Sequence, residues 1–154
     1  MTTVQPTDDK VFLLDAYAII YRSYYAFLKN PRINSKGVNT SAIFGFVNIL
    51  DELIRNEKPE YIAIVFDPGG KTFRHETYEE YKAQRQKTPE DIKNAIPYIK
   101  RIIEAYGIGI FEMEGYEADD VIGTMAKRLQ GEGFGVYMRL WRSEERRVGK
   151  ECRS

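Results

Sequence analysis

Two apolar runs that each end in an aspartate predict buried strands in the first half of the chain. They are Lys10 to Asp15 (KVFLLD) and Tyr61 to Asp67 (YIAIVFD). Short continuous apolar runs of this kind are typical of strands that are buried on both faces of a parallel sheet. Two shorter runs, Gly109 to Met113 and Phe134 to Met138, predict further strands.

Helical segments are expected between these strands. One contains Arg22 and follows the first strand, and another runs from about Tyr116 to Leu129. Over 40–57 and 89–106, apolar residues recur at the three- and four-residue spacing of a single helix face.

The helix over 89–106 carries sequence signals at both ends. Thr88 is the expected N-cap, Pro89 the first helical residue, and Gly107 the residue just beyond the helix. Strands that alternate with helices of this length predict an α/β fold with a mainly parallel sheet and flanking helices. Because ligands bind outside the carboxyl ends of such strands, Asp15 and Asp67 are expected at the functional edge of the sheet.

Three acidic residues open the helix that follows Gly115. At 100° per residue, Glu117 and Asp120 lie about 60° apart and share a face. Acidic residues at this position can simply complement the helix dipole. If Asp15 and Asp67 lie nearby, however, the carboxylates would repel one another unless a cation compensates them. Oxygen ligands alone favour Mg²⁺ or Mn²⁺, which suits phosphodiester hydrolysis.

A segment over 71–85 combines basic and aromatic residues at helical spacing. Such a mixture suits single-stranded nucleic acid, with phosphates on the cations and bases on the rings. A solvated amphipathic helix with inward-packed tyrosines is the alternative interpretation, and His75 is expected to be a surface or capping residue. The residues concerned are Arg74, Tyr78, Tyr81, Lys82 and Arg85.

Composition narrows the class of protein. The 154 residues suffice for one domain with one core. No apolar run approaches the roughly 20 residues of a membrane span, residues 1–9 lack signal-peptide features, and a cytoplasmic location is expected. The single cysteine, Cys152, excludes an intramolecular disulfide and a multi-thiolate zinc site. Residues 139–154 contain six basic and three acidic residues, which gives this segment a net charge of +3. Residues 1–138 contain 17 basic and 20 acidic residues, a net charge of −3.

Several segments together resemble the 5′ nuclease (flap endonuclease) domain at the N-terminus of bacterial DNA polymerase I. The resemblance runs from about Val11 to Met138. It rests on LLDAYAIIYRSYYA, SKGVNTSAIFGFVNIL, VFDPGGKTFRHETYEEYKAQR, TPEDI and GYEADDVIG, in this order.

The resemblance implies a Rossmann-like nuclease fold related to PIN domains, with a helical arch over approximately 71–87. It implies a 5′-3′ exonuclease that cuts 5′ flaps with two divalent ions, Mg²⁺ or Mn²⁺. By position, the metal carboxylates would be Asp15, Asp67, Glu117, Asp119 and Asp120, with Asp67 and Asp120 also catalytic. Lys82 and Arg85 would be catalytic arch residues, and the DNA contacts would be Arg22, Arg74, Tyr81, Lys82 and Arg85, although a structural ion pair is an equally good role for Arg22.

The resemblance ends near residue 138. The family continues with a Thr-x-Asp-x-Asp loop and a helix-hairpin-helix element. This chain instead continues with residues 139–142 and then with Ser143 to Ser154, which look like translated adapter or vector sequence, so residues 139–154 are treated as non-native. We therefore expect a disordered N-terminus over 1–9, an incomplete nuclease domain over 10–138, and a non-native, disordered or loosely helical tail. One metal position would be nearly complete, and truncation would expose an apolar sheet edge.

Three functions fit these observations. The first is a DNA nuclease acting on 5′ flaps or 5′ ends, monomeric, with a polymerase domain in the same chain of the parent protein. The second is a PIN-like RNA nuclease, which would not need the arch segment. The third is a catalytically defective fragment that still binds nucleic acid.

Overall fold

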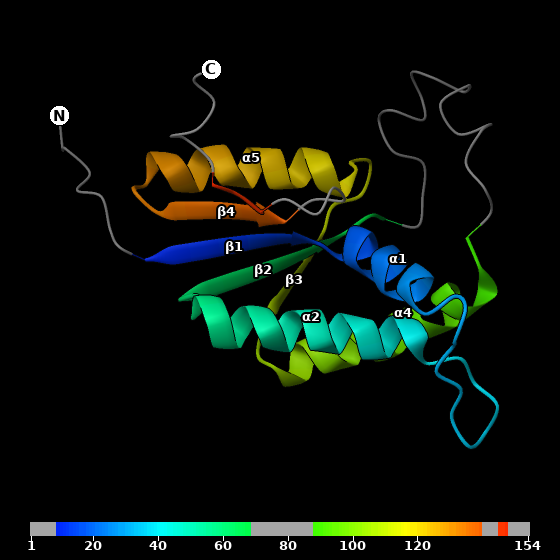
Figure 1. The fold of residues 1–154 in the computed structure, drawn as a ribbon. Coiled ribbons are helices and arrows are strands. Elements are labelled where there is room, and N and C mark those ends of the chain that lie inside the picture. The colour runs from blue at the N-terminus through cyan, green and yellow to red at the C-terminus, as the bar shows by residue number, and fades with distance from the viewer. Residues whose placement is uncertain (1–8, 69–87, 140–144, 148–154) are drawn as a thin grey trace, which may run out of the picture.

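The computed structural model describes residues 9–68, 88–139 and 145–147, which form one sheet with helices on both faces (Figure 1). The sheet order is β3-β2-β1-β4-β5. The first four strands are parallel, and β5 runs antiparallel to β4. Their bounds are β1 Lys10–Asp15, β2 Tyr61–Phe66, β3 Gly109–Glu112, β4 Gly135–Arg139 and β5 Glu145–Arg147.

The helices divide unequally between the two faces of the sheet. In Figure 1, α5 lies above the sheet, and α1, α2 and α4 lie below it. Their bounds are α1 Ala16–Ala26, α2 Ser41–Glu57, α4 Glu90–Ala105 and α5 Ala118–Gly131. The α/β fold with a mainly parallel sheet, expected from the sequence, is confirmed.

Alternation along the central strands builds a core on each face. Phe12 and Leu14 of β1 pack with α1, α2 and α4, whereas Val11 and Leu13 pack with α5. Both sets are almost fully buried, as the apolar runs predicted. Asp15 is paired in register with Val65, so the carboxyl ends of β1 and β2 lie at the same edge of the sheet.

The expected start of the helix over 89–106 is wrong by one residue. Pro89 is the N-cap of α4, and its carbonyl oxygen accepts hydrogen bonds from the backbone N–H groups of Ile92 and Lys93. The Thr88 hydroxyl is instead hydrogen-bonded to the Tyr21 hydroxyl of α1 (2.9 Å). The expected helix end is confirmed, because Gly107 adopts φ +74° immediately after the C-cap.

The expectation of a disordered or loosely helical tail is wrong for residues 145–147. These residues pair with β4, with Tyr137 opposite Arg147 and Arg139 opposite Glu145. The physical reason is that the outer edge of β4 offers backbone hydrogen-bonding groups to a returning strand. The expected sheet edge is therefore partly covered in this chain. Residues 1–8 of the N-terminus expected to be disordered over 1–9, and the helical arch expected over approximately 71–87, fall outside the described residues. Asp9 is ordered, because its carbonyl oxygen accepts a hydrogen bond from the Gly135 N–H (3.0 Å).

Within the described ranges, the helices are too short or too polar for any of them to span a membrane.

Candidate metal and nucleic-acid site

The first acidic residue of the candidate site connects a strand to a helix. Asp15 is the last residue of β1 and the N-cap of α1, where its Oδ1 accepts a hydrogen bond from the backbone N–H of Ala18 (3.2 Å). This geometry follows from the sequence, because an aspartate between an apolar strand and a helix satisfies an N–H group of the first turn. The side chain is thereby fixed at the carboxyl edge of the sheet.

Asp67 joins the end of β2 to the start of α5. It directly follows Phe66, and its Oδ1 accepts a hydrogen bond from the backbone N–H of Ala118 at 2.6 Å. Residues that lie far apart in the sequence thus meet at one edge. The positive end of the α5 dipole also favours a carboxylate at this position.

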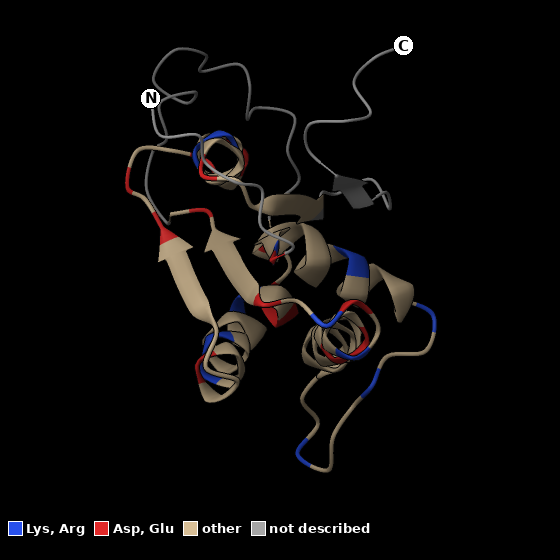
Figure 2. Cartoon of the chain, turned by 90° about the vertical axis from the view of Figure 1, so that its left-hand side faces the viewer, with Lys and Arg blue, Asp and Glu red and all other residues tan. Residues whose placement is uncertain are grey.

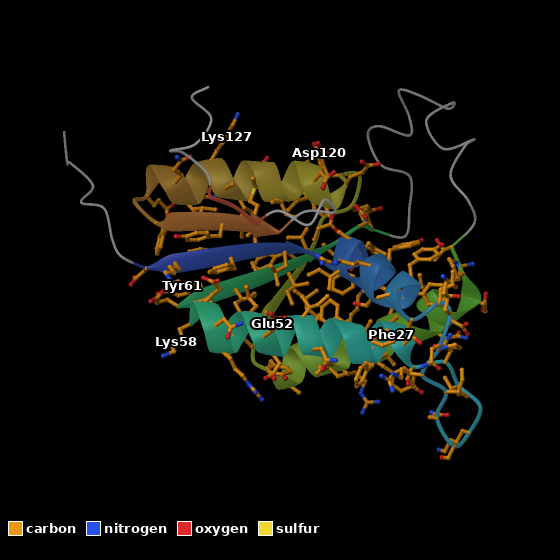
Figure 3. All side chains as sticks on the ribbon, in the orientation of Figure 1. Phe27, Glu52, Lys58, Tyr61, Asp120 and Lys127 are labelled. Carbon is orange, nitrogen blue, oxygen red and sulfur yellow. The ribbon has the colours of Figure 1, made fainter. Side chains whose placement is uncertain are left out.

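The first turn of α5 adds the remaining acidic residues. Glu117 is the N-cap of α5 and is 7% exposed, Asp119 is exposed and Asp120 is partly exposed. The N–H groups of Asp120 and Val121 donate to the Glu117 carbonyl oxygen (3.1 and 3.2 Å). Acidic segments at the tips of the strands are visible in Figure 2, and Figure 3 shows Asp120 at the end of α5 nearest this edge.

The surroundings of Asp15 shift the pKa of its carboxyl group. Burial, the negative charges of Asp67 and Asp119, and a side-chain hydrogen bond with Asp119 raise the pKa of Asp15 to about 7, against a lowering contribution from the Ala18 N–H. A carboxyl group with this pKa holds a proton over much of the neutral range. Burial and the neighbouring carboxylates thus both disfavour the ionised form of Asp15.

The expected convergence of all five acidic residues is only partly visible. Asp15 interacts with Asp67 and Asp119, and Asp67 contacts the N-terminus of α5. In the described ranges, no three His, Cys, Asp or Glu side chains are grouped closely enough to hold a metal ion. The assignment of Asp15, Asp67, Glu117, Asp119 and Asp120 to a common metal site therefore stays a prediction.

Residues 10–139 match the family described as the 5′-3′ exonuclease, N-terminal resolvase-like domain. This chain belongs to that family. Residues 10–139 thus form a 5′-3′ exonuclease N-terminal domain, and the resemblance noted from the sequence is confirmed.

Two curated relatives illustrate the relationship. The domain is 44% identical over 128 residues to "DNA polymerase I" of Bacillus subtilis, which covers 82% of this chain and 14% of that protein. It is 44% identical over 126 residues to a "5′-3′ exonuclease" of Aquifex aeolicus, covering 82% of this chain and 43% of that protein. The chain thus spans only a small part of the polymerases that it matches and less than half of the exonuclease.

Solved structures share the fold. A T5 5′-exonuclease with bound divalent zinc ions gives a TM-score of 0.56 at 21% identity, covering 84% of this chain and 48% of that one. The T5 D15 protein co-crystallised with metal ions gives 0.55 at 21% identity, with 84% and 47% covered. The likeness confirms the expected nuclease-type, PIN-related fold of the exonuclease domain.

The predicted DNA contacts of the exonuclease domain divide into two groups. Arg22 lies on α1 with an exposed side chain. The other four, Arg74, Tyr81, Lys82 and Arg85, fall outside the described residues.

Sequence reasoning missed further residues at the same edge. Tyr17 packs edge-on against Phe66 (5.8 Å between ring centroids), and burial together with the charges of Asp67 and Glu112 raises the pKa of Tyr17. Glu112 ends β3, so the rule that located Asp15 and Asp67 also finds it. Lys100 of α4 reaches Glu112, and the sequence carries no signal for that contact.

Proposed function

We propose that this chain is the N-terminal part of a metal-dependent 5′-3′ exonuclease and flap endonuclease that hydrolyses DNA phosphodiesters. The observation that carries the proposal is the meeting of Asp15, Asp67 and the first turn of α5 at one edge of the sheet. Membership of the exonuclease family supports it, as does the similarity to the 5′-3′ exonuclease of Aquifex aeolicus. The intact parent protein is proposed to continue into a polymerase domain, as the Bacillus relative's name suggests.

The chemistry of the acidic residues fits a hard divalent cation. The donor atoms are carboxylate oxygens. Burial and, to a smaller extent, the negative charges of Asp67 and Asp119 raise the pKa of Asp15, and a bound cation would favour its ionised form. We assign Asp15, Asp67, Glu117, Asp119 and Asp120 as the residues that would hold Mg²⁺ or Mn²⁺, with a complete site taking two ions. When bound, such ions polarise water and stabilise the charge that builds on a phosphate.

The chain's own residues supply the remaining functions in this proposal. The Ala118 N–H holds the Asp67 carboxylate through Oδ1, and Oδ2 would be the oxygen that binds a cation. Lys82 and Arg85 would draw in the scissile phosphate and stabilise charge in the transition state. Arg22 and Arg74 would contact other phosphates, and Tyr81 would stack on a base.

Cleavage assays test the proposal directly. This chain would be compared with a version continued by the Thr-x-Asp-x-Asp loop and helix-hairpin-helix that the sequence resemblance implies. With Mg²⁺ or Mn²⁺, the continued version should cut a 5′-flapped DNA much faster than a single-stranded RNA of the same sequence. Equal or faster cleavage of the RNA would select an RNA nuclease, and a metal-independent reaction would contradict the proposed site.

A non-catalytic role for the chain as given has one observation in its favour. Across the described residues, the acidic side chains do not form a closed group of metal ligands. Flap binding without cleavage by this chain, together with cleavage by the continued version, would assign this role to the short chain alone.

A further inference from the structure

Lys100 of α4 lies beside the acidic edge. Its Nζ lies 4.8 Å from the centroid of the Phe66 ring and 3.4 Å from Oε2 of Glu112. Phe66 directly precedes Asp67, and Glu112 is paired with Phe66 in the sheet register. Lys100 therefore contacts the residue that directly precedes a predicted metal ligand, on the α4 side of the sheet.

The Lys100–Glu112 pair differs from the other described ion pairs. Arg55–Asp51 and Arg128–Glu132 join residues four apart in sequence. Lys100–Glu112 instead joins a helix to the end of a strand, with side chains that are 34% and 40% exposed. An exposed pair of this kind contributes only about 0–1 kcal/mol to stability, so stability alone does not account for a lysine at this position.

The geometry leaves Lys100 able to accept another anion. An ammonium group has three N–H donors, and Glu112 accepts one of them in the described contacts. The Phe66 ring fixes the position of the ammonium without neutralising it. A phosphate that approaches the acidic edge needs such a cation, because the carboxylates around it repel phosphate.

We propose that Lys100 binds a backbone phosphate of the nucleic-acid strand beside the candidate metal site, and that Glu112 occupies this cation when no nucleic acid is bound. The inference rests on the proposed function, whose substrate it places along the β3 side of the sheet. When nucleic acid binds, a phosphate oxygen replaces the Glu112 carboxylate at Nζ of Lys100. Glu112 therefore competes with the phosphate and lowers the affinity for nucleic acid, although it also holds Lys100 in position when no nucleic acid is bound.

The test is a salt titration of binding to a 5′-flapped DNA, followed by fluorescence anisotropy, with the full chain and its variants. Lys100→Gln should weaken binding by about 3- to 10-fold at 0.1 M salt. It should also reduce the slope of log affinity against log salt by about 0.7–0.9, the value for one lost phosphate contact. Glu112→Gln should tighten binding by up to about 5-fold, because it removes the competing acceptor.

Lys127→Gln is the matched control. Lys127 is exposed on α5 and points away from the sheet in Figure 3, and its substitution changes the net charge by the same amount. Equal effects of Lys100→Gln and Lys127→Gln, or no binding by the unaltered chain at low salt, would overturn the proposal. Thermal unfolding of each variant checks that the fold is retained.

Cleavage by the continued version, measured alongside binding, separates the two proposals. Binding that does not depend on Lys100, accompanied by Mg²⁺-dependent cleavage of the continued version, overturns the role of Lys100 alone. Binding that depends on Lys100, without cleavage by the continued version, supports the phosphate contact and contradicts the nuclease.

Discussion

Asp15 is the residue at this edge on which stabilising and destabilising interactions act together. It caps a helix, lies next to two other carboxylates and is largely removed from water. The helix cap is readable from a strand that ends in aspartate and is followed by a helix, and a nearby carboxylate is expected because parallel strands end at the same edge of a sheet. The size of the burial is not readable in this way, because it depends on how α1 and α5 close over the edge of the sheet.

The raised pKa of Asp15 predicts a pH-dependent loss of stability without divalent cations. From pH 4 to 7 the native state keeps a proton that the unfolded chain has released, so the free energy of unfolding falls as pH rises. The full penalty, at most about 4 kcal/mol, applies above pH 7. Urea unfolding of the chain and of Asp15→Asn in EDTA should therefore give stabilities that are similar near pH 4 and favour the variant at pH 8.

Asp51→Asn provides a comparison, because Asp51 forms an exposed pair with Arg55. Its effect should be small at both pH values. Adding Mg²⁺ should reduce the advantage of Asp15→Asn at pH 8, since a bound cation stabilises the ionised carboxylate. If Asp15→Asn is more stable than the unaltered chain by the same amount at pH 5 and pH 8, burial does not raise the pKa of Asp15.

Asp67→Asn separates the structural role of Asp67 from its proposed metal role. The amide oxygen can still accept the Ala118 N–H, so the junction with α5 is retained. Loss of the charge should lower cleavage by the continued version at least about 100-fold, as removal of one electrostatic group at a reacting centre does. Flap affinity should change little. Asp120→Ala should behave in the same way, and near-normal cleavage at millimolar Mg²⁺ by either variant would contradict the assignment.

The packing of α1 against α2 depends on close approach at one glycine. A Cβ at Gly45 would lie 2.5 Å from the Ser23 Cβ, and Ser23 is buried with its hydroxyl donating to the Ile19 carbonyl oxygen (2.7 Å). The two helices cover the same core, so their separation affects where the N-terminus of α1 holds Asp15 at the edge.

Gly45→Ala should lower the free energy of unfolding by about 1–3 kcal/mol, because the helices must move apart. Gly123→Ala is the control within α5, where an added Cβ meets nothing within 4 Å. That change should raise stability by about 0.5–1 kcal/mol through helix propensity. Chemical denaturation measures the free energy of unfolding of both variants. A Gly45→Ala variant that is more stable than the unaltered chain would show that α1 and α2 can separate at Ser23 without cost.

The strands, helices and strand-end acidic residues could be predicted because they rest on local patterns. The apolar runs around Phe12 and Ile64 and the acids at 117–120 need no knowledge of distant segments. The Lys100–Glu112 pair, the Tyr21–Thr88 hydrogen bond and strand β5 could not be predicted. Each depends on how separate elements meet, and β5 further depends on an edge left open by β4.

The molecule as a whole has two unlike ends. The acidic edge lies at the carboxyl ends of the strands, and a groove of about 450 Å³ lined by Tyr61, Tyr106 and their neighbours lies at the opposite ends. In Figure 3, Tyr61 and Lys58 mark that opposite end, far along the sheet from Asp120. The loop between α1 and α2 carries further Lys and Arg residues at the periphery of the molecule, as Figure 2 shows.

Deleting residues 140–154 should change the free energy of unfolding by less than about 1 kcal/mol, since β5 pairs only 3 residues with β4. Self-association should rise, because the outer edge of β4 becomes available to another chain. Urea unfolding and sedimentation of the two versions at equal concentration test both outcomes. A large loss of stability would show that the tail is part of the fold, and unchanged sedimentation would show that the edge is protected otherwise.

The central place of β1 has a kinetic consequence. Lys10 near the start of the chain pairs with Gly135 near its end, while the other side of β1 pairs with β2. During synthesis, β1 is made before the other described strands, but it cannot pair with β4 until the residues up to about 139 have left the ribosome. Pairings this distant slow folding, and the waiting strand, apolar on both faces, is open to chaperones and to aggregation in the meantime.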